Sequence, residues 1–99
     1  TIIFDEIDSG VSGDIAAKVG NLLKQMSENH QLITITHLPQ IAAKANSQYF
    51  VFKENKKGKT SSNITLLNDE DRVEQIAKML SDERVSDSAR ETAKDLMNN

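Results

Sequence analysis

Three acidic side chains lie within four positions of the sequence, directly after an apolar run. Asp5, Glu6 and Asp8 follow Ile2–Phe4, and such a run indicates a β-strand that is buried on both faces of a parallel sheet. Open α/β sheets bind ligands at the carboxyl ends of their strands. One carboxylate there could hold Mg²⁺ through water while the neighbouring glutamate polarises an attacking water. These residues predict a hydrolytic site, and the alternative is an acidic strand end that only meets solvent.

His37 is the second side chain suited to this chemistry, and it follows the β-branched strand predicted over residues 31–36. Apolar residues at helical spacing predict a helix from Ile15 to about residue 28, between the two strands. The three elements form a βαβ unit, whose strands run parallel and end at the same edge of the sheet. We therefore expect His37 to face the acids and to donate to a phosphate oxygen. The alternative is that it caps the next helix.

The rest of the chain predicts an α/β fold in which a β-hairpin and C-terminal helices follow the βαβ unit. A short helix over residues 38–45 has Pro39 in its first turn. The hairpin strands cover residues 48–53 and 60–68, and acids open the helix that begins at Asp69. Ser86 is expected to cap a last helix that runs to Met97. We find no domain boundary within residues 1–99.

Lysines gather in the turn of the predicted hairpin, at Lys56, Lys57 and Lys59. The Gly58–Thr60 sequence lacks the earlier glycine of a phosphate-binding P-loop, and a strand rather than a helix follows it. We interpret the lysines as a solvated turn, with contact to a phosphate backbone as the alternative.

Composition restricts the function classes. The net charge is −3 and there is no cysteine, so the chain has neither the basic excess of an autonomous nucleic-acid binder nor a thiolate metal site. No apolar run approaches the roughly 18 residues of a membrane span, and we expect no membrane partner. The sequence opens in mid-strand without an initiator methionine, which suggests a piece of a longer protein.

Two motif blocks resemble a known family. The run Phe4–Gly13 and the run Ile35–Ala42 are similar to the RecN family of bacterial DNA repair proteins, which are SMC-like ATPases of the ABC type. Residues 49–53 and 72–80 are also similar to that family, so that the resemblance covers essentially the whole chain. Ile2–Glu6 resembles the Walker B strand of these ATPases.

The resemblance implies a role for each site residue. Asp5 would bind Mg²⁺, Glu6 would be the catalytic base for ATP hydrolysis, and His37 would be the switch histidine near the γ-phosphate. A glycine-rich D-loop would meet the second head across an ATP-sandwich dimer, and it comprises Asp8, Ser9, Gly10, Ser12 and Gly13. Ser12 departs from the aspartate that typical ABC proteins carry at this position, so the role of that aspartate does not transfer.

The resemblance also implies what surrounds the chain. Residues 1–99 would be the C-terminal half of an ATPase head, a partial P-loop NTPase sheet with ATP and Mg²⁺ as cofactors. Its partners would be the N-terminal half of the head, a second head in a homodimer and, through the whole protein, DNA in the bacterial cytoplasm and nucleoid. No Walker A or signature motif is present, so the fragment alone should be inactive. The strand over residues 31–36 would keep an unpaired edge that favours self-association.

Two other functions fit parts of the sequence. A metal-dependent nuclease or phosphatase would use Asp5, Glu6, Asp8 and His37 as direct metal ligands. A non-catalytic interaction domain would use the hairpin and the acidic helices to bind a partner.

Overall fold

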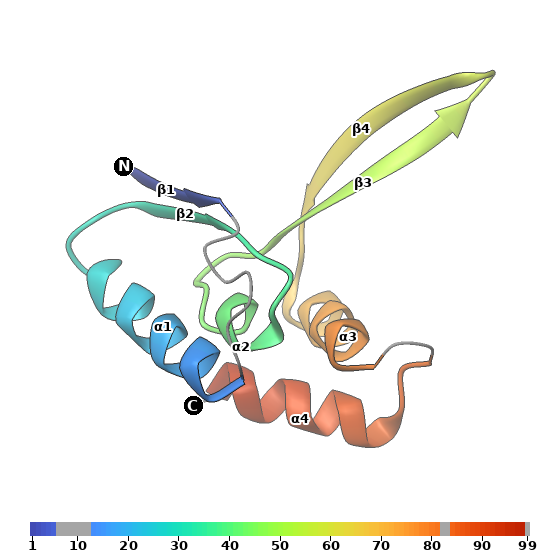
Figure 1. Ribbon diagram of the computed structural model, residues 1–99. Helices are drawn as coiled ribbons and strands as arrows, with labels where there is room; N and C mark the ends of the chain where they lie inside the picture. The colour runs from blue at the N-terminus through green and yellow to red at the C-terminus, as the bar shows by residue number, and fades with distance from the viewer. Residues whose placement is uncertain (6–12, 82–83, 99) are drawn as a thin grey trace.

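The computed structural model describes residues 1–5, 13–81 and 84–98. Figure 1 shows the two strands of the N-terminal part lying side by side, with the helices below them and a long hairpin pointing away from both. In chain order the elements are β1 (Ile2–Asp5), α1 (Gly13–Met26), β2 (Leu32–Ile35), α2 (Pro39–Ala42), β3 (Tyr49–Lys56), β4 (Lys59–Leu66), α3 (Asp69–Leu80) and α4 (Asp87–Asn98). This mixed α/β order is the order that the sequence predicts.

The predicted βαβ unit is confirmed. β1 pairs with β2 in parallel, with Ile2 opposite Leu32 and Asp5 opposite Ile35. α1 connects the two strands. Both strands therefore end at the same edge of their sheet, which is the arrangement on which the predicted site depends.

The sheet of β1 and β2 is open on one face, so the predicted burial of β1 on both faces does not occur within this chain. Half-buried and exposed residues alternate along both strands. The exposed side chains include Ile3, Ile33 and Ile35, which are 64%, 46% and 51% accessible. In the described residues β2 pairs only with β1. A parallel sheet normally has both faces covered, and these apolar side chains lack that cover.

The hydrophobic core lies between α2, α3 and α4 and is built mainly of alanine. Its buried members are Ala42, Ala43, Ile76, Ala77, Ala89 and Ala93, and the partly buried residues around them are Val73, Leu80, Val85, Leu96 and Met97. Ile76 is the largest fully buried side chain among the described residues. Because alanine is short, the helices can pack closely at the density of a protein interior.

β3 and β4 form an antiparallel hairpin that is longer than predicted. The strands continue to the pair Lys56–Lys59, so the turn has two residues, whereas the predicted strands leave residues 54–59 between them. Lys57 and Gly58 occupy it with φ values of 52° and 76°, and two positive φ values are what a type I′ turn requires. The radius of gyration is 14.3 Å, compared with about 13 Å for a compact chain of this size, because the hairpin projects from the helices (Figure 1).

Two predicted helix starts have recognisable caps. The side chain of Asn68 accepts a hydrogen bond from the backbone N–H of Asp71 at the start of α3. The hydroxyl of Ser86 accepts one from the N–H of Ala89 over 3.1 Å, which confirms the predicted cap of α4. Among the described helices, none has the length and hydropathy needed to cross a bilayer.

Candidate functional site

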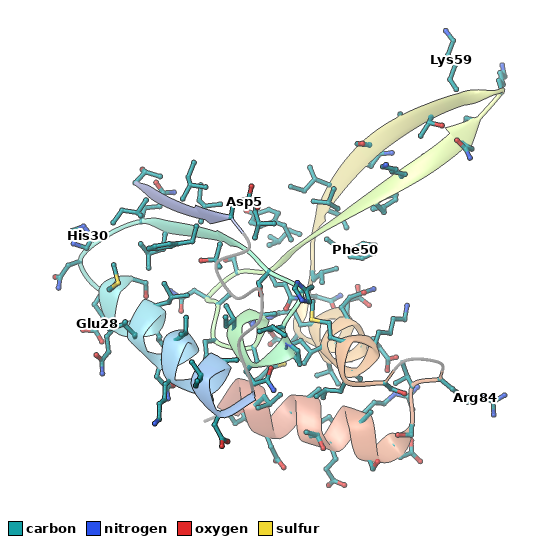
Figure 2. All side chains as sticks on the ribbon, viewed as in Figure 1. Asp5, Glu28, His30, Phe50, Lys59 and Arg84 are labelled. Carbon is teal, nitrogen blue, oxygen red and sulfur yellow. The ribbon has the colours of Figure 1, made fainter. Side chains whose placement is uncertain are left out.

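Asp5 and His37 lie at the same edge of the β1–β2 sheet. Asp5 is the last residue of β1 and lies opposite Ile35, the last residue of β2. His37 follows two residues later, and both side chains are exposed. Figure 2 shows Asp5 at the end of its strand. The parallel register thus places the two strand ends that carry these residues at one edge, as the βαβ prediction requires, whereas their roles in catalysis stay predictions.

The turn that carries His37 is fixed on both sides. The backbone N–H of Leu38 donates to Oγ1 of Thr36 over 3.0 Å, which bends the chain directly after the strand. Leu38 has an extended backbone and Pro39 occupies the first turn of α2, where its fixed φ suits the helix. His37 is therefore placed between a strand end and a helix start whose backbone directions are both defined.

Gly13, the last residue of the predicted loop, lies beside α2. A Cβ atom placed on Gly13 would lie 3.5 Å from Nε2 of Gln40, three residues after His37. Oε1 of Gln40 is buried and has no hydrogen-bond partner among the described residues. The start of α1 and the segment that carries His37 are thus neighbours. The other predicted site residues lie outside the described residues, namely Glu6, Asp8, Ser9, Gly10 and Ser12.

The described residues could serve Mg²⁺ only in a mode with few protein ligands. No group of three histidine or acidic side chains gathers in the described part of the chain. Mg²⁺ in nucleotide sites often takes one or two carboxylates and completes its octahedron with water and phosphate oxygens. The exposed carboxylate of Asp5 fits that mode. A two-metal nuclease site would need further ligands beyond Asp5 and His37.

A cleft in the described part of the chain lies elsewhere, along the edge of β2. It has a volume of about 740 Å³, and its lining includes Leu23, Leu32, Ile33, Tyr49 and Ile64 but not Asp5, Gly13 or His37. Leu32 and Ile33 point to opposite faces of β2, so the cleft follows the edge of the strand and not one of its faces. We interpret it as space beside an incomplete sheet, bounded on the far side by Tyr49 and Ile64 of the hairpin.

Arg72 is a structural anchor that the sequence analysis missed. This arginine of α3 is 8% accessible, and its Nη2 donates to the carbonyl oxygen of Ala45 over 2.9 Å and to those of Ala42 and Ala43 over 3.5 Å. Its Nε donates to Oε1 of Gln48 over 3.3 Å. Carbonyls at a helix end lack partners within the helix and favour a nearby cation. Arg72 therefore connects α3 both to the end of α2 and to Gln48, which directly precedes β3.

A sequence signal for this role exists. Arg72 is four residues before Ile76, on the apolar face of α3. A cation on an apolar face is expensive to bury unless it is hydrogen-bonded, so its position indicates a partner inside the fold.

Gly20 is a second position that the sequence analysis missed. A Cβ atom there would lie 2.9 Å from the carbonyl oxygen of Gln40 and 3.2 Å from Cγ of Lys44. Gly20 thus allows α1 and α2 to approach backbone to backbone, and this contact holds the segment after His37 against α1.

Comparison with known proteins extends over nearly the whole chain. It is 40% identical to DNA repair protein RecN of Vibrio cholerae, 43% identical to that of Xylella fastidiosa and 37% identical to that of Bacillus subtilis, each over 97 residues or 98% of this chain. The chain is similar to a segment of RecN. The resemblance inferred from the two motif blocks is therefore confirmed. The chain spans only 17–18% of the length of these RecN proteins. No protein-family model matches it.

Proposed function

We propose that this chain is the C-terminal half of the ATPase head of a RecN-like DNA repair protein. The observation that carries the proposal is the placement of Asp5 and His37 at one edge of a parallel strand pair, within the two segments that resemble RecN. In this proposal β1 and β2 are two strands of a larger P-loop sheet of the ABC and SMC-like type. The protein works in the bacterial cytoplasm, at the nucleoid.

Each predicted catalytic residue has a part in hydrolysis. Bound ATP–Mg²⁺ supplies the phosphoanhydride bond that is cleaved. Asp5 holds the metal, Glu6 accepts a proton from the attacking water, and His37 donates to an oxygen of the γ-phosphate, where charge increases during transfer. The residues of the predicted D-loop contact the second head of a homodimer, and they are Asp8, Ser9, Gly10, Ser12 and Gly13.

Several features support a need for more protein around this chain. Large apolar side chains lie outside the described core, including Ile3, Ile15, Leu22, Ile33 and Ile35, and exposed apolar patches mark interaction surfaces. The cleft beside β2 offers an unpaired strand edge between two apolar walls. In our proposal the N-terminal half of the same head covers these surfaces and supplies the phosphate-binding loop. The chain alone then neither binds ATP well nor hydrolyses it.

Co-expression with the upstream half of the head tests this function. The assembled head should dimerise when ATP and Mg²⁺ are added and should release phosphate. Glu6→Gln should keep the ATP-dependent dimer and lose at least a hundredfold in turnover, because removal of a general base typically costs 10²–10⁴-fold. Glu28→Gln, an exposed residue after α1, is the matched control and should behave as the wild type.

Two outcomes would reject the proposal. One is Mg²⁺-dependent phosphate release by the 99-residue chain alone that is lost on Glu6→Gln. The other is tight Mn²⁺ binding by the chain without nucleotide, since direct coordination by several side chains is the property of a nuclease or phosphatase site.

A further inference from the structure

The hairpin has an apolar root and a basic tip. Near the root, Tyr49 pairs with Leu66 and Val51 pairs with Ile64, and all four side chains lie on one face and are more than half exposed. Beyond Phe52 and its partner Asn63 the side chains become polar or charged. The apolar surface of the root is therefore suited to packing against another protein surface, whereas the charged tip is suited to contact with solvent or with a charged partner.

The tip concentrates positive charge in an acidic chain. Residues 53–59 contain four lysines and one glutamate, although the whole chain has a net charge of −3. The lysines are Lys53, Lys56, Lys57 and Lys59, and all four are exposed. Figure 2 shows the side chain of Lys59 at the far end of the hairpin, away from the helices. Their charges are thus separated from the acidic residues of α3 and α4.

The arrangement of these lysines works against the stability of the hairpin. Lys56 and Lys59 are directly opposite each other across the strands, and like charges in such a pair are destabilising. Glu54 is 3.6 Å from the Lys56 ammonium, but an exposed ion pair of this kind contributes little. Lys57 has a φ of 52°, a conformation that favours glycine or asparagine. An anion bound at the tip would relieve the repulsion between Lys56 and Lys59.

The shape of the hairpin favours a nucleic acid as that anion. Each strand has eight residues and extends roughly 27 Å at about 3.4 Å per residue. A two-stranded ribbon fits the major groove of B-DNA, which is about 12 Å wide. Ser61 and Ser62 place exposed hydroxyls on β4 beside the lysines, and lysine and serine are common donors to phosphate oxygens. The hydroxyl of Thr60 instead donates to Oδ1 of Asn55 across the hairpin.

We propose that the basic tip, residues 53–62, is an arm that binds the phosphate backbone of duplex DNA without reading its sequence. The choice of DNA over another polyanion rests on the repair role in the proposed function, but the contact requires neither ATP nor the second head. The segment contains no arginine, and its lysines meet phosphate as point charges, so the contact is electrostatic and depends on salt.

Fluorescence anisotropy with a labelled 30-base-pair duplex in about 50 mM salt tests the arm on the 99-residue chain, without nucleotide. The variant Lys56→Gln/Lys57→Gln/Lys59→Gln should bind at least tenfold more weakly. A plot of log K against log salt concentration should also be less steep for this variant, with a slope smaller in magnitude by about 2–3, as expected for the loss of three phosphate contacts. The control Lys18→Gln/Lys24→Gln/Lys78→Gln removes the same charge from exposed positions of α1 and α3 and should bind within about threefold of the wild type. Circular dichroism should show that both variants keep the wild-type fold.

Replacement of the three tip lysines by arginine keeps the charge and should retain binding, which distinguishes loss of charge from local unfolding. The proposal is overturned if the wild-type chain does not bind the duplex, or if both glutamine variants weaken binding equally, which would indicate a general charge effect. It is also overturned if polyglutamate competes as well as DNA does per unit charge, because the arm would then fit an acidic protein. None of these results bears on ATP hydrolysis, so failure of the arm is distinguishable from failure of the proposed ATPase.

Discussion

The guanidinium of Arg72 lies 2.9 Å from the carbonyl oxygen of Ala45 and thereby connects α3 to the chain that follows α2. Arg72→Met keeps most of the apolar stem and removes every donor. We expect a loss of about 2–3 kcal/mol in the free energy of unfolding, because hydrogen bonds to a charged group contribute about 1.5–3 kcal/mol and the carbonyls stay unsatisfied. Urea unfolding followed by circular dichroism measures the change.

Arg72→Lys separates the contribution of the positive charge from that of the guanidinium geometry. Lysine keeps the charge but presents a single ammonium instead of the planar fork of arginine, so an intermediate loss is expected. Lys78→Met, at an exposed position of the same helix, should change stability by less than about 0.5 kcal/mol. Equal stability of Arg72→Met and the wild type would show that the buried contacts of Arg72 do not hold the fold.

Gly20→Ala tests the close approach of α1 to α2. Alanine gains up to about 1 kcal/mol in helix propensity, but its Cβ would lie 2.9 Å from a backbone carbonyl. Overpacking typically costs about 1–3 kcal/mol, so we expect a net loss of stability. Asn21→Ala, on the exposed side of α1, should instead stabilise slightly. If thermal melts show Gly20→Ala to be the more stable of the two, the helices are not in backbone contact.

The hairpin turn should respond in opposite directions at its two positions. Lys57→Asn should stabilise the chain by up to about 1 kcal/mol, because asparagine tolerates the positive φ of 52° better than lysine does. Gly58→Ala should destabilise it by about 1 kcal/mol. Nothing lies within 4 Å of a Cβ at Gly58, so that loss would come from the backbone alone. Amide hydrogen exchange along β3 and β4 reports both changes.

Self-association of the 99-residue chain should depend on the apolar walls of the cleft beside β2. Ile33 and Ile64 line this cleft, and Ile33→Thr/Ile64→Thr removes apolar surface while it keeps the β-branched shape that suits a strand. Sedimentation velocity should show the mass falling toward the 11.0 kDa of the monomer. Asn29→Thr, in the exposed loop after α1, should leave it unchanged. A wild-type chain that stays monomeric at high concentration would contradict the prediction.

Periodic patterns predicted most of the fold. The apolar and β-branched runs of the strands, the apolar faces of the helices and the cap at Ser86 are local signals, and the structure retains the elements that they predict. The hairpin turn was predicted too long because Lys57 is an unusual residue for a positive φ, so that the two-residue turn has only Gly58 as its signal.

The placement of Asp5 relative to His37 was predictable because βαβ geometry fixes which strand ends meet. Gly20 was not predicted, since its importance comes from a contact with α2 that no spacing within α1 encodes. Arg72 was missed although its place on the apolar face of α3 indicates a buried partner. The apolar run of Ile2–Phe4 predicted burial on both faces, whereas the structure leaves Ile3 exposed. In a complete sheet other elements would pack on both faces of this strand, and in our proposal the rest of the head supplies those elements.

The alanine-rich interface between α2, α3 and α4 has a consequence for how the chain tolerates mutation. In most cores truncation is the severe change, because it leaves a cavity. Ala77 and Ala93 are fully buried and have almost nothing to truncate, so the severe changes at these positions are enlargements. In a saturation mutagenesis screen, Ala77 and Ala93 should accept glycine or serine more readily than leucine or valine.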